Sequence, residues 1–215
     1  LFFSCTLYAG EDFQAKVFKG KDVFTLNYRI HIPDKIEKNE VCPLVLVLHG
    51  AGHRGNDNNK QIRKSFGPME ILGYAKKIKT KVIIIAPQVP GKELWVNVPW
   101  GGLSHVMPPE PSSSMQMTID LLKQCMKTMP IDKQRIYVTG LSMGGFGTWD
   151  IIQRNPQMFA AAIPICGGGD TNLAEKIKHI PIWVFHGDKD DTVKTSHSRD
   201  MVAALKKASG SPLYT

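Results

Sequence analysis

Apolar runs that alternate with segments of helical periodicity constrain the fold of this chain more than any other feature of its sequence. Residues 42–50 (CPLVLVLHG) and 81–88 (KVIIIAPQ) are continuous β-branched and leucine runs, which are typical of strands covered on both faces. Three further runs share this character, at 135–140, 159–167 and 180–187. Residues 23–33 (VFTLNYRIHIP) instead alternate apolar and polar side chains, which indicates a half-exposed antiparallel strand.

Helical patterns lie between and after these runs. They cover residues 67–79, 112–129, 143–154, 172–178 and 195–208. Strands that alternate with helices predict an α/β domain, with a mostly parallel sheet, helices on both faces and an antiparallel N-terminal hairpin. Because the chain shows no internal repeat and no low-complexity linker, we expect one domain over residues 13–215. In such a fold, side chains that carry chemistry are expected at the carboxyl ends of the strands.

The segment 138–149 (VTGLSMGGFGTW) places Ser142 in a G-x-S-x-G pattern, directly after a strand and directly before a helix. This is the context of a nucleophile elbow, in which a sharp turn lifts a serine hydroxyl above the edge of the sheet. Gly140 and Gly144 would remove the side chains that otherwise collide at such a turn. The alternative is a glycine-rich turn whose serine only caps the following helix.

A serine nucleophile needs a base and an acid that orients the base, and in this arrangement the acid follows the serine along the chain. The loop 183–193 (WVFHGDKDDTV) supplies Asp188, Asp190 and Asp191. We assign Asp190 as the acid, because H-G-x-x-D-x-x-V places it past the tight turn after His186. The alternative for the whole cluster is a solvated acidic turn.

The loop 48–58 (LHGAGHRGNDN) follows the first buried run, and its glycines would let the backbone fold toward Ser142. The backbone N–H of Ala51, together with that of Met143, could hold the oxyanion of a tetrahedral intermediate. His49 is interpreted as a structural histidine at the end of a strand. No metal site is expected, because no carboxylate follows the histidines of this loop at ligand spacing.

The base is missing from the expected place. The only histidine after Asp190 is His197, which the pattern favours as an exposed helix residue, whereas His105 and His179 precede the acid. The last residues (SGSPLYT) resemble the start of a further strand, after which the histidine normally lies. We therefore expect that the C-terminal part of the domain is missing, that the base follows Thr215, and that residues 1–215 are inactive without it.

Composition excludes other classes of function. The net charge of +8 comes from lysines spread along the whole chain rather than from a basic block, so no nucleic-acid partner is expected. No run approaches the roughly 18 apolar residues of a membrane span. The four cysteines form no C-x-x-C pair, and their disulfide pairing is open; Cys125 and Cys166 are interpreted as buried thiols.

Residues 1–12 (LFFSCTLYAGED) combine an apolar stretch with small residues and then acidic ones. We interpret them as a signal-peptide remnant or an N-terminal extension, which predicts a secreted or periplasmic protein. An N-terminal strand is the alternative.

The motifs YRIHIP, PLVLVLHGAGHRGNDN, APQ, GLSMGGFGTW, PICGGGD and VFHGDKDDTV occur in this order. Over residues 13–215 the chain thereby resembles α/β-hydrolase-fold serine esterases of the phospholipase/carboxylesterase and "predicted peptidase" type. It is more distantly similar to feruloyl esterases and polyhydroxyalkanoate depolymerases. The resemblance implies Ser142 as nucleophile, Asp190 as acid, Ala51 and Met143 as oxyanion donors, and Trp95 as an aromatic wall of the acyl site. Trp95 as a plain loop anchor is the alternative.

The resemblance implies hydrolysis of carboxylic esters through an acyl-enzyme, without a cofactor. The substrate is expected to be a small or polymer-linked ester, with feruloyl, acetyl and polyester types open. Two alternatives remain: a serine peptidase of prolyl-oligopeptidase-like type, and a non-catalytic binding module on a hydrolase fold. The Pro- and Gly-rich loop 96–112 is expected to lie over the cleft. The sequence does not predict the oligomeric state.

Overall fold

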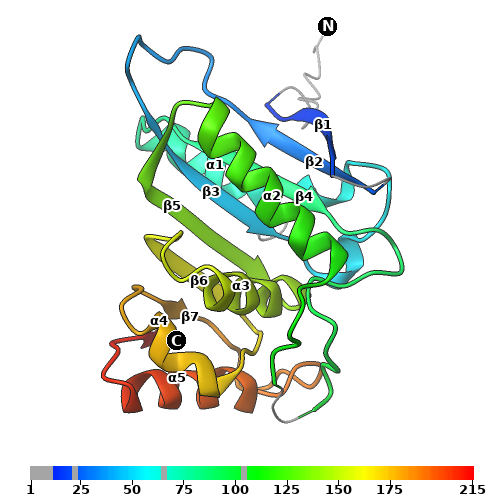
Figure 1. Ribbon diagram of the computed structural model, residues 1–215, viewed down its shortest axis with the longest axis vertical. Coiled ribbons are helices and arrows are strands. Elements are labelled where there is room, and N and C mark those ends of the chain that lie inside the picture. Colours follow the sequence, from blue (N-terminus) through cyan, green and yellow to red (C-terminus); the bar gives the residue numbers. More distant parts are fainter. Residues whose placement is uncertain (1–11, 21–23, 64–66, 103–105) are drawn as a thin grey trace, which may run out of the picture.

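The computed structural model describes residues 12–20, 24–63, 67–102 and 106–215, which form a sheet with helices on both faces (Figure 1). Its strands are β1 (Gln14–Lys19), β2 (Thr25–His31), β3 (Cys42–Leu48), β4 (Ile83–Gln88), β5 (Ile131–Leu141), β6 (Ala161–Ile165), β7 (Trp183–Val184) and β8 (Leu213–Tyr214). Its α-helices are α1 (Pro68–Lys77), α2 (Ser113–Thr128), α3 (Met143–Arg154), α4 (Ala174–Ile177) and α5 (Ser196–Lys207). The short 3-10 helices are η1 (Ala51–His53), η2 (Lys60–Ile62) and η3 (Thr171–Leu173).

The sheet is mostly parallel, as the buried runs predicted. Six strands follow the order β1-β2-β4-β3-β5-β6, and β7 pairs in parallel with β8. Parallel bridges from Ala162 to Ile182 and from Ile165 to Phe185 join β6 to the β7 segment. The first two strands form the predicted N-terminal antiparallel hairpin, and β2 is also antiparallel to β4.

This topology brings several loops to one edge of the sheet. Leu48, near the end of β3, is paired with Gly140 of β5, and Leu141 is paired with Ile165 of β6. The β3–η1 loop, the β5–α3 turn and the loop after β6 therefore start side by side. Figure 1 shows α3 beginning at this edge, directly below the end of β5.

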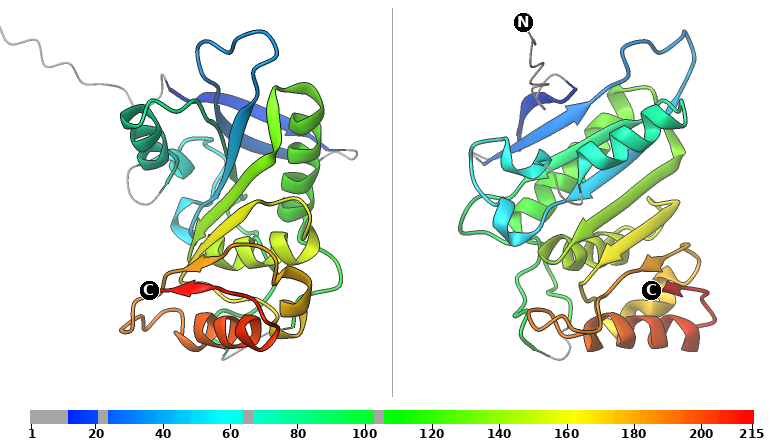
Figure 2. Two further views of the ribbon diagram at one scale, coloured as in Figure 1. Left: turned by 90° about the vertical axis from the view of Figure 1, so that its left-hand side faces the viewer. Right: turned by 180° about the vertical axis from the view of Figure 1, so that it is seen from behind.

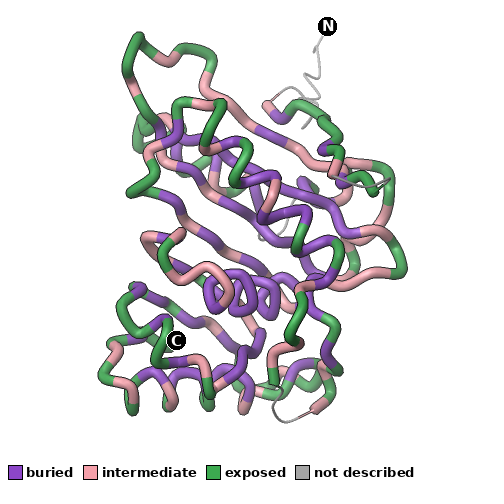
Figure 3. Tube along the Cα trace, in the orientation of Figure 1, coloured by how far each residue is buried: buried purple, intermediate pink, exposed green. Residues whose placement is uncertain are grey.

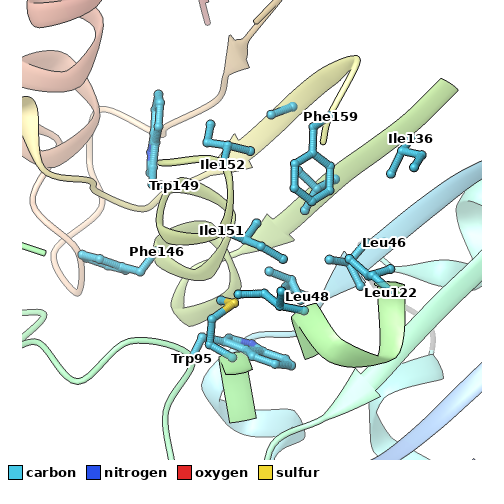
Figure 4. Packing of buried hydrophobic residues seen from close by; sticks show 14 of the residues in the cluster. Leu46, Leu48, Trp95, Leu122, Ile136, Phe146, Trp149, Ile151, Ile152 and Phe159 are labelled. Atoms are coloured by element: carbon cyan, nitrogen blue, oxygen red, sulfur yellow. The ribbon is translucent and has the colours of Figure 1, made fainter. Parts of the chain in front are cut away.

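Apolar side chains fill both faces of the sheet, which explains the continuous apolar runs. Leu46 and Ile85 are fully buried toward α2 and α3, in the larger core cluster, whose packing around α3 is drawn in Figure 4. Their neighbours Val47 and Ile84 point to the opposite face, against α1. Alternate residues of one strand thus belong to two hydrophobic cores, one on each face of the sheet. Figure 3 shows that burial is densest along the central strands and α3.

The N-terminal segment and the prediction about membrane spans can be compared with the structure only as far as the described residues reach. Residues 1–11 are not described, so the interpretation of the N-terminus as a signal-peptide remnant stays a prediction. Within the described part of the chain, no helix combines the length and the apolar character that crossing a bilayer requires.

Candidate active site

Ser142 occupies the turn between β5 and α3 in a conformation that few residues other than glycine adopt. Its backbone has φ 55° and ψ −116°. The surroundings hold it there, because its N–H donates to the Ile165 carbonyl (2.9 Å) and its own carbonyl accepts from the Phe146 N–H (3.1 Å). Strain of this kind costs on the order of 1–3 kcal/mol and persists where neighbouring structure enforces it. The Ser142 residue is partly exposed at this edge of the sheet.

Two glycines make this turn possible by allowing close backbone contact. A Cβ on Gly140 would overlap the Gly144 carbonyl, and one on Gly144 would overlap the Leu48 carbonyl, both far inside the 3.0 Å that real Cβ atoms keep. The start of α3 therefore lies directly on the ends of β3 and β5. The predicted reason for glycine on both sides of Ser142 is confirmed by this geometry.

The loop after β3 lies against the same turn. A Cβ on Gly50 would be 3.4 Å from the Leu141 carbonyl and 3.9 Å from the Ser142 Cβ. Ala51 follows as the first residue of η1, and Met143 is the first residue of α3. In the chain segments that the structure describes, the amide N–H of neither residue donates a hydrogen bond. Both donors are thus available beside Ser142.

The side chain of His49 fixes this loop through hydrogen bonds of both its ring nitrogens. It is buried, its Nδ1 lies 2.7 Å from the Gly50 carbonyl, and its Nε2 accepts from the Val89 N–H at 3.0 Å. Nδ1 must therefore carry the proton and donate it to Gly50. Burial lowers the pKa of His49 to about 4, so the ring is neutral at neutral pH. The interpretation as a structural strand-end histidine agrees with these contacts.

Trp95 does not lie where the resemblance implied. Its side chain is fully buried, its Nε1 donates to the His49 carbonyl (3.0 Å), and a Cβ on Gly147 of α3 would come within 2.9 Å of it. Figure 4 shows the ring beneath the start of α3, beside Leu48. A ring without an exposed face cannot form the wall of an open acyl site. The structure corrects that expectation in favour of the alternative, a loop anchor.

Asp190 is the inward-facing carboxylate of the loop between β7 and α5. Its Oδ1 accepts from the N–H groups of Thr192 (3.0 Å) and Val193 (2.9 Å), and its own N–H donates to the Gly187 carbonyl. These bonds leave Oδ2, which lies 3.5 Å from His186 Nε2. Asp188, in contrast, is exposed and paired with Arg199.

Cys166 connects the surroundings of Ser142 and Asp190, which sequence reasoning missed. It follows β6 with a positive φ of 40°. Burial raises the pKa of its thiol, the negative charge of Asp190 raises it further, and a hydrogen bond from the Ser142 backbone lowers it. The side chain is only partly buried, unlike those of Cys42 and Cys125, so the prediction of a buried Cys166 was wrong in degree. The sequence signal that could have identified Cys166 was its position at the end of the apolar run that forms β6, the strand next to β5.

The described histidines supply no base at this position. His197 is buried rather than exposed, contrary to the prediction, and its ring packs edge-on against Phe146 at 5.1 Å. The exposed His179 ring lies 2.9 Å from the Pro156 carbonyl, and His105 lies outside the described residues. Within the described chain, no histidine is hydrogen-bonded to Ser142, and no three His, Cys, Asp or Glu side chains are placed to hold a metal ion.

In the loop 96–112, residues 107–109 are hydrogen-bonded to this edge of the molecule. The buried carboxylate of Asp170, after β6, accepts from the Met107 N–H at 2.9 Å. Arg154, at the end of α3, donates to the carbonyls of Pro108 and Pro109. Asp170 and Arg154 thus hold residues 107–109 of this loop through hydrogen bonds to its backbone.

Known proteins support this fold. The crystal structure of a thermostable esterase superposes with a TM-score of 0.87 at 38% identity, covering 95% of this chain and 54% of that one. S-formylglutathione hydrolase (FrmB) from Staphylococcus aureus superposes with a TM-score of 0.70 at 15% identity, covering 94% and 86%, and shows the fold alone.

Sequence comparisons point the same way. The bifunctional acetylxylan esterase/xylanase XynS20E of Neocallimastix patriciarum is 22% identical over 182 residues, which are 85% of this chain and 23% of that protein. This chain thus spans about half of the solved esterase and a quarter of the curated relative. Residues 105–211 match the Dienelactone hydrolase family. On these findings the chain has the α/β-hydrolase fold, and its residues 105–211 are similar to the Dienelactone hydrolase family.

Proposed function

We propose that this protein hydrolyses carboxylic esters through an acyl-enzyme formed on Ser142. The observation that carries the proposal is the strained turn at Ser142, held between two glycines and flanked by the free amides of Ala51 and Met143. A strained residue that the surroundings enforce is a feature of functional sites, and the family is one of hydrolases.

The proposed first step is attack of Ser142 Oγ on the ester carbonyl carbon. The hydroxyl proton passes to a base, and the negative charge that forms on the carbonyl oxygen is held by the N–H groups of Ala51 and Met143. Each such donor is worth on the order of 3 kcal/mol of transition-state stabilisation. The base then gives the proton to the departing alcohol. Water repeats the sequence and releases the acid.

Asp190 is the proposed acid that orients the base. Its Oδ1 is occupied by two backbone N–H groups, so Oδ2 remains to accept from an imidazole. The proposed base is a histidine that follows Thr215. Support comes from the His186 and His197 rings, which are engaged elsewhere.

A covalent probe tests the nucleophile directly. We expect a fluorophosphonate to label the full-length protein and not its Ser142→Ala variant, whereas Ser113→Ala, at an exposed serine outside the site, keeps the label. Label that persists in Ser142→Ala would overturn the assignment. If the folded wild-type protein shows neither label nor turnover, the non-catalytic binding module is favoured instead.

Substrate trials distinguish the esterase hypothesis from the peptidase hypothesis. Turnover of p-nitrophenyl acetate, with no cleavage of a chromogenic peptide, is expected of an esterase, and the reverse pattern would identify a peptidase. The related protein of Neocallimastix patriciarum is an acetylxylan esterase/xylanase, so acetylated xylan is the first polymeric substrate to try, followed by a feruloyl ester and a soluble polyester.

A further inference from the structure

An exposed phenylalanine lines two adjoining pockets beside the start of β2. The side chain of Phe24 is 55% exposed, and Phe24 shares both pockets with Met117 of α2. The pockets have volumes of about 370 and 460 Å³, which is the size range of small-ligand sites. We call the two pockets together the Phe24 groove. A ligand in either pocket would contact the aromatic ring.

The first pocket carries hydrogen-bonding groups that the described protein does not use. Asn27 Nδ2 donates to the Asn56 carbonyl at 3.1 Å, which leaves the Asn27 Oδ1 acceptor open. Glu93 Oε2 accepts from Ser114 Oγ at 2.6 Å, whereas no described residue donates to Glu93 Oε1. The hydroxyl of Thr25 lines the same pocket and adds a hydrogen-bond donor. This pocket thus offers both acceptors and a donor to a ligand.

The second pocket has the same mixture of groups. Its carboxylates are those of Glu110, before α2, and Asp120, on α2. Among the residues that the structure describes, neither carboxylate forms an ion pair or a side-chain hydrogen bond. The amide of Gln116 lies on the same lining and can both donate and accept. A ligand that spans both pockets would therefore meet open donors and acceptors on either side of Phe24.

The charges of the groove select among ligand classes. Its described lining holds no lysine or arginine, although the protein carries a net charge of +8, so an anionic ligand finds no cationic partner there. An ammonium ligand would meet the carboxylates, but it only donates hydrogen bonds and leaves the donors of Thr25 and Gln116 without an acceptor. A sugar hydroxyl donates and accepts, and the C–H face of a pyranose ring packs on an aromatic ring. The lining therefore fits a neutral carbohydrate.

The groove lies at the edge of the sheet that carries Ser142. Gln88, the last residue of β4, lines the first pocket, and the next residue, Val89, donates to His49 Nε2. His49 is hydrogen-bonded in turn to Gly50, which packs against the turn at Ser142. A polymer held in the groove would therefore continue along the edge where the ester is expected to be cleaved.

We propose that the Phe24 groove binds a segment of a neutral polysaccharide and holds the sugar chain whose ester group is cleaved at Ser142. A pyranose ring packs its C–H face on Phe24, and its hydroxyls donate to Asn27 Oδ1 and Glu93 Oε1. Binding of the sugar is independent of the catalytic assignment. The use of the groove for substrate rests on the proposed function.

Calorimetric titration tests the binding site without any turnover. The probes are xylohexaose and cellohexaose, which carry no ester, and the protein is full-length Ser142→Ala. We expect heat of binding with at least one of the two sugars. In this background, Phe24→Ala and Phe24→Leu are expected to weaken binding at least tenfold, because neither presents a flat ring, whereas Phe24→Trp retains it.

The matched control is Tyr74→Ala, which removes an exposed aromatic ring from α1 and should leave sugar binding unchanged. Spermine tests the cationic alternative and is expected to bind more weakly than the sugars. The proposal is overturned if neither hexasaccharide binds, if Phe24→Leu binds as well as the parent protein, or if spermine binds more tightly than both sugars.

Kinetics of the full-length enzyme test whether the groove serves the reaction. We compare kcat/KM for acetylated xylohexaose with kcat/KM for p-nitrophenyl acetate, which is too small to span the groove and the catalytic turn. Phe24→Ala is expected to lower the ratio of the two values at least tenfold, through KM for the sugar ester, and Tyr74→Ala should keep it. An unchanged ratio in Phe24→Ala would refute the role of the groove in substrate binding. Sugar binding through Phe24 in a protein that hydrolyses neither ester would refute the proposed function and support the binding site.

Discussion

At the scale of single residues, the contact between α3 and the strand ends tolerates no side chain at Gly144. We expect Gly144→Ala to lower the free energy of unfolding by about 3 kcal/mol, because the new Cβ would overlap the Leu48 carbonyl, which is backbone and cannot move aside. The matched control is Gly73→Ala on α1, where no atom lies within 4 Å of the new Cβ. That change is expected to stabilise the protein by about 0.4–1 kcal/mol. Urea unfolding measures both, and equal effects would contradict the argument.

His49 gives stability a pH dependence of predictable sign. Its pKa is about 4 in the folded protein, below the ordinary value of 6.5, so the unfolded chain binds the proton more readily. The stability from its neutral ring is complete above pH 6.5 and is lost as the pH falls from 6.5 to 4, by up to about 3 kcal/mol. His49→Gln is expected to reduce the slope of unfolding free energy against pH in this window. His179→Gln, which replaces an exposed histidine in the same way, is the matched control.

Sequence patterns predicted individual residues unevenly. Glycine at 140 and 144 was predictable, because the strand–serine–helix order implies a tight turn. His197 was wrongly expected to be exposed, although Met201 and Leu205 follow it at helical spacing and are buried on the same face of α5. Trp95 was misplaced because a loop sequence does not tell which side of the loop meets the core. The ring contacts of His186 depend on α5 docking, which no local pattern encodes.

At the scale of elements, α2 depends on one capping serine. Ser112 Oγ accepts from the Met115 N–H (3.1 Å) and donates to the Trp95 carbonyl (2.8 Å), so it joins the helix to the loop after β4. Ser112→Ala is expected to cost about 2 kcal/mol of stability, the upper range for a cap, since both bonds are buried. Ser113→Ala, one residue on and exposed, should change stability by less than about 0.5 kcal/mol. Thermal unfolding compares them, and similar losses would exclude the capping role.

The elements were more predictable than their lengths. Runs 42–50 and 81–88 became β3 and β4, and 143–154 became α3 with the predicted bounds. The run 180–187 holds only the two-residue β7, because β7 lies toward the margin of the sheet and is joined to β6 by isolated bridges. The segment 172–178 splits into η3 and α4, since Asp170 caps a 3-10 turn at Asn172 before the helix starts. Such tertiary details override local periodicity.

At the scale of the whole molecule, the two faces of the sheet are covered unequally. Figure 2 shows α2 and α3 along one face, whereas α1 covers only the part of the other face near β3 and β4. The parallel register places Ile163, Trp183 and Leu213 in one row across β6, β7 and β8 on the side of α1. Their side chains are 38%, 43% and 60% exposed. The continuous apolar runs predicted strands that are buried on both faces. In this part of the sheet, only one face is buried.

This apolar row is expected to govern how residues 1–215 behave in solution. Contiguous exposed apolar side chains bind hydrophobic dyes and lower solubility. We expect the double variant Ile163→Lys, Trp183→Lys to reduce the fluorescence of bound 8-anilinonaphthalene-1-sulfonate at least twofold, with unfolding free energy changed by less than about 1 kcal/mol, because both side chains are already partly in water. Tyr74→Lys adds a charge at an isolated exposed apolar residue on α1 and controls for charge alone. Equal dye binding by all three proteins would show that the row is covered in solution.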